Sequence, residues 1–451
     1  MYETNKGTKP LVERYGLEAI PKHAQNTSAI EYTFIQMAIS VNAGNVLVPA
    51  LAVLEGGLTF LQAVLSTVVG AAFAFICVSF LALPGAKYGI PAQYSIRAIL
   101  GVGGTRYLAS PIRTVTSMYW FAVQTIGGTY LIKELIERTL HIQFPFLGIA
   151  LVMATLMAVL ALIGFEAVKK ATKYFLPILF VGGLVMLFIL LTSEVEGRTY
   201  ETVINSPSSA PLGTMLFFAS LAFVQYVSGV SSASDMARYA KSEKHAFYGL
   251  FLGNLSGFFL TAILGAYTAA LAGSVNPYVI SSQLTNSTLA LTIILVAAMA
   301  SMVMINISNA YTGGYSLLNS LPSLGRVKSA VLFGCCAIIL SSFPILVEQA
   351  QTYISYLGAL IIPISAVIVF DFLLLKKRRF TEKDFLGLAR GDYQYNFQGL
   401  SASFAGMALY LLLPNGWSPG FIAFIGTGVI YLIISLKFKR KNESNQVENI
   451  G

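Results

Sequence analysis

Residues 36–53 read QMAISVNAGNVLVPALAV, and this stretch decides the fold. It belongs to an apolar run long enough to cross the ~30 Å hydrocarbon core of a bilayer. Its middle holds four residues that disfavour a continuous membrane helix, namely Asn42, Gly44, Asn45 and Pro49. Backbone groups that such residues free must be satisfied by protein, water, an ion or a ligand. We therefore expect a helix that is broken inside the membrane.

A second apolar run, residues 217–239, reads FFASLAFVQYVSGVSSASDMARY and is interrupted in its second half. The small and polar residues there are Gln225, Ser228, Gly229, Ser231, Ser232 and Ser234. The two interruptions fall in the first and sixth apolar runs, five helices apart. Matching breaks of this kind are typical of inverted five-helix repeats with a binding site at the midplane. The alternative for either break alone is a kink or a close helix contact.

About twelve apolar runs of ~17–25 residues recur along the 451 residues. The fold class is therefore an all-α integral membrane protein with about twelve transmembrane helices, built as an inverted 5+5 repeat with broken helices 1 and 6 plus two C-terminal helices. The expected spans are 33–54, 58–84, 107–132, 145–164, 172–192, 211–234, 246–272, 286–308, 329–346, 353–375, 399–415 and 418–436.

These spans group into six expected segments of the chain. The segments are a cytoplasmic N-terminal part (1–32), a first repeat (33–192), a second inverted repeat (211–375), a cytoplasmic loop (376–398), two accessory helices (399–436) and a cytoplasmic tail (437–451).

The cations support this topology and give it a direction. With both termini in the cytoplasm, all but three of the 29 Lys and Arg residues fall in inner segments, Arg113 being counted with the inner segment 85–113. The exceptions are Lys133, Arg138 and Arg198. Cytoplasmic loops are enriched in Lys and Arg. We expect a multi-pass plasma-membrane protein, and the net charge of +9 to reflect its contact with the lipid bilayer rather than with nucleic acid.

Composition excludes several classes of protein. Charged residues make up 11% of the chain, against roughly a quarter in soluble domains. Cys77, Cys335 and Cys336 all lie in expected spans without a CxxC pair, which argues against a disulfide framework or a zinc site. No clustered His or carboxylates and no Walker loop occur. We expect no enzyme and no cofactor.

The third span contains SMYWFAVQTIGG (117–128), which places Trp120 and Gln124 four residues apart on one helix face. An indole beside a carboxamide suits a flat polar heterocycle, because the ring can stack and the amide can both donate and accept hydrogen bonds. Tyr226, next to Gln225 at the second break, is a candidate for the opposite face of the ring. Core packing is the alternative for each of these residues.

Span eight ends MINISNAYTGGYSLLN (304–319), a polar patch in an otherwise apolar helix. Such patches line cavities or bond neighbouring helices. The carboxylates Glu55, Asp235 and Asp371 each lie near an expected membrane surface, where snorkelling or a structural ion pair is favoured.

Taken together, several stretches resemble the nucleobase–cation symporters, in particular the purine–cytosine permease branch. The matching stretches are VERYGLEAIP (12–21), AKYGIPAQYSIRAILGVGG (86–104), WFAVQTIGG (120–128), ASDMARYAKS (233–242), SNAYTGGYSLL (308–318) and DFLLLKKRRF (371–380). The resemblance implies a leucine-transporter-like fold of twelve helices that works by alternating access.

The resemblance also implies roles for individual residues. Trp120 matches a stacking tryptophan and Gln124 an edge-binding glutamine, with Tyr226 at the second stacking position and Gln225 beside it. In span one Asn45 matches a polar substrate contact, with Asn42 as the alternative register. In span eight Asn309 matches the amide-bearing stretch.

For the coupling ion, the resemblance implies backbone carbonyls of the first break, here Val41 and Gly44, with hydroxyls of span eight. One alignment puts Met304 and Ile305 at the hydroxyl positions, and another uses Ser308 with Asn309. Methionine and isoleucine side chains cannot ligate a hard cation. Sodium and proton coupling therefore both stay open.

The expected function is import of a nucleobase (purine or cytosine) or a related planar heterocycle, coupled to a cation gradient, by a protein that works as a monomer. The alternatives are an amino-acid or amine symporter on the same fold and a permease for allantoin, hydantoin or vitamin-type heterocycles. A membrane-embedded enzyme and a sensor that binds without transport are less well supported.

Overall fold

The computed structural model describes residues 17–161, 165–207 and 210–448, and over these ranges the protein is all-helical apart from two isolated bridges. The principal helices are α1 (Ala29–Ser40), α2 (Leu47–Leu54), α3 (Phe60–Tyr88), α6 (Ser110–Leu140), α7 (Phe146–Ala161), α8 (Phe165–Thr192), α10 (Leu212–Val227), η3 (Ser228–Ser231), α11 (Ala233–Ala237), α12 (Glu243–Ala272), α14 (Thr288–Ser320), α15 (Gly325–Leu340), α17 (Ala350–Phe370), α19 (Phe397–Leu412) and α20 (Pro419–Glu448).

Short helices lie in the connections between them. They are η1 (Lys22–Ala24), α4 (Ala92–Leu100), α5 (Val102–Gly104), η2 (Thr105–Ala109), α9 (Tyr200–Ile204), α13 (Pro277–Gln283), η4 (Pro322–Leu324), α16 (Ile345–Glu348), η5 (Asp371–Leu375), α18 (Glu382–Arg390) and η6 (Asn415–Trp417).

Eight helices among the described residues are long and apolar enough to cross a membrane, and two shorter apolar helices cover Phe146–Val159 and Phe397–Leu412. The expectation of a multi-pass, all-α membrane protein is confirmed. Each of the twelve expected spans overlaps one to three helices, although the ends differ. The loop 376–398 contains α18, and α20 continues to Glu448, well past the expected end of the last span.

The first helix begins four residues earlier than expected, because its start is capped by side chains. The Ser28 hydroxyl accepts from the Glu31 backbone amide at 3.2 Å, and the Glu31 carboxylate accepts from the Ser28 amide at 2.9 Å. This reciprocal pair satisfies backbone donors that a helix start leaves open.

Both expected breaks are confirmed. Helix α1 ends at Ser40 and α2 begins at Leu47, so residues 41–46 form a non-helical link within the first span. In the sixth span α10 ends at Val227, a 3-10 turn (η3) follows, and α11 begins at Ala233.

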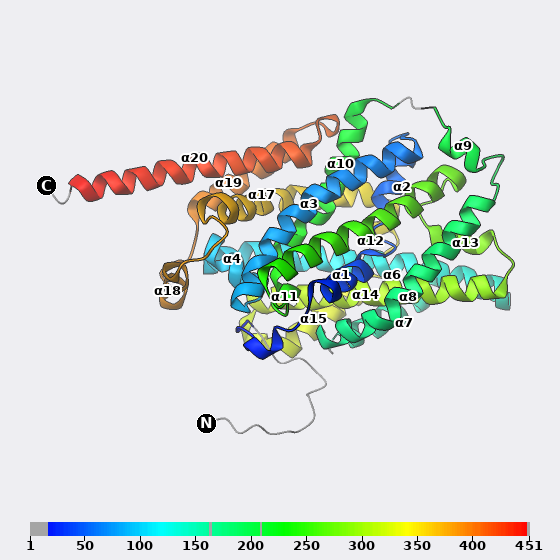
Figure 1. Ribbon diagram of the computed structural model, residues 1–451, viewed down its shortest axis with the longest axis horizontal. Helices are drawn as coiled ribbons and strands as arrows, with labels where there is room; N and C mark the ends of the chain where they lie inside the picture. The colour runs from blue at the N-terminus through cyan, green and yellow to red at the C-terminus, as the bar shows by residue number, and fades with distance from the viewer. Residues whose placement is uncertain (1–16, 162–164, 208–209, 449–451) are drawn as a thin grey trace, which may run out of the picture.

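The helices pack in two groups. In Figure 1 the axes of the long helices run roughly along the long axis of the molecule. In the first group α12 packs against α1, α2 and α3, while α3 also packs against α10 and α11. In the second group α6, α7, α14 and α15 pack on one another. Helix α8 contacts α1, α12 and α14 and so touches both groups, and α17 packs against α10, α19 and α20. Both broken helices therefore belong to the first group.

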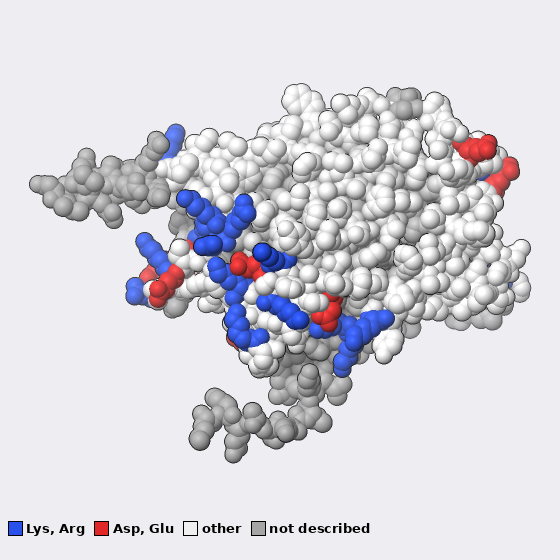
Figure 2. Space-filling model, viewed as in Figure 1, with Lys and Arg blue, Asp and Glu red and all other residues white. Residues whose placement is uncertain are grey.

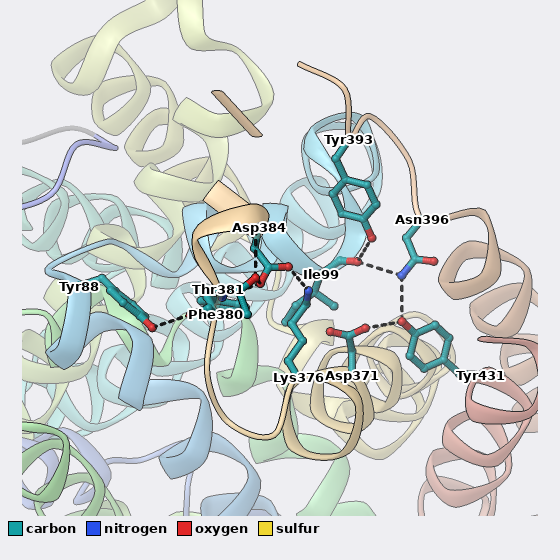
Figure 3. A network of polar contacts seen from close by, with 10 residues as sticks. All are labelled: Tyr88, Ile99, Asp371, Lys376, Phe380, Thr381, Asp384, Tyr393, Asn396 and Tyr431. Atoms are coloured by element: carbon teal, nitrogen blue, oxygen red, sulfur yellow. Dashed lines mark hydrogen bonds and ion pairs between the residues drawn. The ribbon is translucent and has the colours of Figure 1, made fainter. Parts of the chain in front are cut away.

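Residues 376–396, which follow η5, form a polar strap at one end of the bundle (Figure 3). Asn396 donates to the carbonyl of Ile99 at 2.9 Å and to the Tyr431 hydroxyl at 3.0 Å, and Tyr393 donates to the same carbonyl at 2.8 Å. The Tyr431 hydroxyl in turn donates to the carboxylate of Asp371. The network fastens α4, η5 and α20 together.

Within the strap, Lys376 and Asp384 form an ion pair at 2.5 Å. Burial opposes ionisation of Asp384, but the hydrogen bonds from Lys376 and Thr381 prevail and hold its pKa below the ordinary value. The ion pair ties the start of α18 to the residue that follows η5.

Candidate functional site

The first break is held open by its own asparagines. The Asn42 amide donates to the carbonyl of Ile39 at 2.7 Å, and its side-chain oxygen accepts from the Asn45 backbone amide at 2.9 Å. The side-chain amide of Asn45 donates to the backbone carbonyl of Ser40 at 2.7 Å. The two asparagine side chains thus form hydrogen bonds with backbone carbonyl and amide groups that the interrupted helix leaves without an intrahelical partner.

Gln124 reaches from α6 to the same break. Its side-chain oxygen accepts from the Gly44 amide at 2.9 Å, and its nitrogen donates to the Asn42 oxygen at 2.6 Å. A Cβ on Gly44 would lie 2.3 Å from the Gln124 nitrogen, so the approach requires glycine at this position. The carboxamide expected to bind a substrate edge is thus engaged with the non-helical link, although Gln124 also lines the cavity described below.

The two breaks meet at Gln225. Its amide donates to the Gly44 carbonyl at 3.4 Å and to the Asn45 side-chain oxygen at 3.3 Å, while its own oxygen is buried without a hydrogen-bond partner. The neighbouring Tyr226 hydroxyl is also buried and unpaired. The junction of the two broken helices therefore carries spare polar atoms.

Aromatic rings flank this junction. The Tyr226 ring packs against Phe75, with centroids 4.7 Å apart, and against Phe258 at 4.9 Å. Trp120 is half-buried on α6 and meets Tyr119 edge to face at 5.1 Å. Trp120 and Tyr226 come from different helix groups and line one cavity.

That cavity has a volume of about 160 Å³ and lies between the two helix groups. It brings together the six expected substrate residues, Trp120, Gln124, Tyr226, Gln225, Asn45 and Asn309. Its other polar lining residues are Tyr32, Gln36, Ser40, Asn42, Arg113, Ser228, Ser232, Asn254, Ser308 and Thr312. The volume is below the ~300–1,000 Å³ of pockets for drug-sized ligands, so it favours a compact solute.

The polar patch of span eight faces both the cavity and its neighbours. Asn309 lines the cavity and donates to the Asn306 oxygen at 3.4 Å. Asn306 is fully buried and donates to the Phe121 carbonyl at 3.2 Å and the Thr125 hydroxyl at 3.1 Å, both on α6. Asn309 therefore has a cavity-lining position, whereas Asn306 binds two helices together.

The residues named for the ion have different surroundings in the structure. Ser308 lies in the cavity wall, and the Gly44 carbonyl accepts from Gln225. The Val41 side chain lines a different, apolar pocket between α1, α8 and α12. Ile305 also lines the main cavity, and Met304 is fully buried. The ion site is untested by this geometry.

Sequence reasoning missed Arg113. It was assigned to a cytoplasmic segment, but the structure places it in the cavity wall, where it donates to the Thr312 hydroxyl at 3.1 Å. A signal was available, because positions 113, 117, 120 and 124 follow the i, i+4, i+7, i+11 pattern of one helix face.

Of the two roles expected for the carboxylates, snorkelling is wrong for Asp235 and Asp371. Asp235 is 0% exposed and accepts from the Ala92 amide at 2.8 Å, and Asp371 is 5% exposed and bound by Tyr431. Each lies near the end of a span, but α4 covers Asp235 and α20 contacts Asp371. The local sequence does not predict either contact. Glu55 is exposed at the end of α2, as expected.

The described residues hold no group of three or more His, Cys, Asp or Glu that could bind a metal ion. A family model described as "Permease for cytosine/purines, uracil, thiamine, allantoin" matches residues 19–433. The chain belongs to this family. It is accordingly a membrane permease and not an enzyme, and its family handles small heterocycles.

Two relatives of known class agree with this family assignment. The chain is 22% identical over 446 residues to a purine-uracil permease of Arabidopsis thaliana, covering 86% of this chain and 72% of that protein. It is 23% identical over 372 residues to an allantoin permease of Bacillus subtilis (strain 168), covering 73% and 72%.

The fold is similar to that of Mhp1, a nucleobase-cation-symport-1 family transporter, in a closed conformation with bromovinylhydantoin bound. The TM-score is 0.77 at 14% identity, over 96% of each chain. A Na+-coupled sialic acid symporter gives a TM-score of 0.63 at 14% identity, over 92% of this chain and 91% of that one. The expected leucine-transporter-like architecture thus receives support from the whole fold.

Proposed function

We propose that this permease imports a nucleobase or a related planar heterocycle, such as an allantoin or hydantoin, by symport with a cation. The observation that carries the proposal is a cavity between the helix groups that is lined by both helix breaks and by Trp120 and Tyr226. A cavity shared by two helix groups can open to one side at a time when the groups rock against each other.

In this proposal the ring stacks on Trp120 and faces Tyr226, and the edge is bound by Asn45, Asn309 and the spare oxygen of Gln225. Each aromatic face adds roughly 0.5–1.5 kcal/mol beyond burial. A substrate that lacks a matching donor or acceptor leaves a buried polar group unpaired at a cost of ~1–3 kcal/mol. The aromatic residues thus provide affinity and the amides provide discrimination.

The finer organisation is part of the proposal. Twelve spans form two inverted repeats (33–192 and 211–375) with two accessory helices (399–436), both termini are cytoplasmic, and one protomer suffices for transport. Amino acids are poorer candidates, because a solute without a planar ring would make little use of paired aromatic faces.

The test is uptake of radiolabelled uracil, adenine, cytosine and allantoin into proteoliposomes. The chain has two tryptophans, so Trp417→Ala is a matched control, since that side chain is 64% exposed in η6. We expect Trp120→Ala to weaken apparent affinity at least about tenfold, the equivalent of 1.4 kcal/mol. Normal transport by this variant, or competition by amino acids and not by heterocycles, would contradict the proposal.

The same vesicles identify the coupling ion. Uptake that is lost when choline replaces sodium at constant pH assigns sodium coupling. Uptake that persists in choline and collapses with a proton ionophore assigns proton coupling. Val41, Gly44 and Ser308 are the positions to vary in the first case.

A further inference from the structure

Arg113 introduces a formal positive charge into the substrate cavity. Of the described residues that line the cavity, it alone carries such a charge, and none is an Asp or Glu. It shares one face of α6 with Trp120, seven residues or about 10 Å farther along the helix. The guanidinium therefore belongs to the same cavity as the proposed stacking residue.

The contacts of Arg113 place it at the second break. One Nη donates to the Thr312 hydroxyl on α14 at 3.1 Å, and the other lies 3.5 Å from both the carbonyl and the hydroxyl of Ser228. Ser228 is two residues from Tyr226, and Thr312 is one helical turn from Asn309. The charge thus lies beside the residues proposed to hold the ring.

These contacts do not pair the guanidinium with a carboxylate. All its partners are neutral oxygens, two of the contacts are long, and Nε is buried with no hydrogen-bond partner. Among the ion pairs of the described residues, none places a carboxylate within 4.0 Å of Arg113. Uncompensated charges inside a membrane protein are costly and mark pathways for a solute or an ion.

Asp235 acts on Arg113 from outside the cavity lining. Asp235, whose Oδ1 accepts from the Ala92 amide, is within electrostatic range of Arg113, Arg238 and Arg326. Arg238 donates to the hydroxyls of Tyr311 and Tyr315, and Arg326 lies over the Tyr315 ring at 4.2 Å. Asp235 is therefore shared among Arg113, Arg238 and Arg326.

We propose that the transported heterocycle is an anion, with its ring against Trp120 and its charged edge, a ring carboxylate or a deprotonated imide, on the Arg113 guanidinium. This inference rests on the proposed function and narrows it. Arginine suits the role because its planar fork can give two parallel charge-assisted hydrogen bonds to such an edge. The bound anion also supplies the counter-charge that the cavity lacks.

The experiment compares ligands that differ in charge. In a Trp417→Phe background Trp120 is the remaining tryptophan, so quenching of its fluorescence reports binding directly. The pairs are uracil with uracil-6-carboxylate and hypoxanthine with urate, both acids being anions at neutral pH. We expect the anionic member to bind at least about tenfold more tightly than the neutral one, a difference of 1.4 kcal/mol.

Variants then assign the preference to one residue. Arg113→Gln is expected to remove the preference for the anion by weakening the anionic member at least about tenfold more than the neutral one, and Arg113→Lys to retain most of the preference. Arg106→Gln is the matched control, because Arg106 lies seven residues earlier and binds the Ser320 carbonyl outside the cavity.

The outcomes separate the two proposals. If the wild-type protein prefers the neutral members, or if Arg113→Gln weakens both members equally, the anion proposal is overturned while heterocycle binding still supports the proposed function. If no member of either pair quenches Trp120 or competes for uptake, both proposals fail. The wild-type comparison decides the matter even if the Gln variant does not fold.

Discussion

Gln124 has contacts in the structure that differ from the substrate contact predicted for it. Both ends of its carboxamide are engaged by the first break, through the Gly44 amide and the Asn42 oxygen. It therefore fixes the non-helical link of one helix group from the other group. An effect of Gln124 on substrate binding would then be indirect and would not depend on which heterocycle is bound.

At this scale we predict that Gln124→Leu weakens the binding of uracil, hypoxanthine and allantoin by similar factors and lowers thermal stability. Stranding the buried Gly44 amide costs about 1–3 kcal/mol. Fluorescence titration and thermal unfolding in detergent measure both effects, with the exposed Gln283→Leu as control. A loss confined to one heterocycle would instead assign Gln124 to direct substrate contact.

At the scale of elements, α12 positions α1 through a groove of glycines at four-residue spacing. A Cβ at Gly249 would lie 2.8 Å from Tyr32, one at Gly253 2.4 Å from the Thr33 carbonyl, and one at Gly257 2.7 Å from Ser40. Small residues at this spacing allow membrane helices to approach closely. The first break is held in register because the helix before it lies in this groove.

We predict that Gly253→Leu lowers the unfolding temperature and weakens substrate binding, because the added side chain pushes α1 away from α12. Overpacking of this kind costs about 1–3 kcal/mol. Gly183→Leu on α8 is the matched control, since nothing lies within 4 Å of a Cβ there. Equal shifts in the two variants, measured by thermal unfolding, would show that the groove does not position α1.

At the scale of the whole molecule, charge is distributed unevenly along the bundle. Figure 2 shows Lys and Arg gathered at the end that carries α4 and α18, whereas the visible face of the opposite end shows mainly acidic groups. Basic residues are favoured on the cytoplasmic side of a membrane. The end that carries the strap of Figure 3 is thus the proposed cytoplasmic end.

We predict that a cysteine at Lys383, in α18, reacts with a membrane-impermeant maleimide only after cells are permeabilised, whereas one at Glu196 reacts in intact cells. Both positions are exposed, at opposite ends of the bundle. The native Cys77, Cys335 and Cys336 lie within helices and provide the background signal. The reverse labelling pattern would invert the proposed orientation.

The sequence by itself determined the helical membrane class, the approximate spans and the two breaks, because hydropathy and backbone-loosening residues act over short stretches of chain. It also placed Trp120 and Gln124 on one helix face by their spacing and Tyr226 at the second break, while the role of Asn309 came from the family resemblance. Only the tertiary structure decided which partners these side chains contact. Gln124 binds the first break, Asp235 is buried, and Arg113 lines the cavity. These outcomes depend on contacts between residues about 80 to 200 positions apart, such as the Arg113–Thr312 hydrogen bond across 199 positions. The local sequence pattern does not predict such packing.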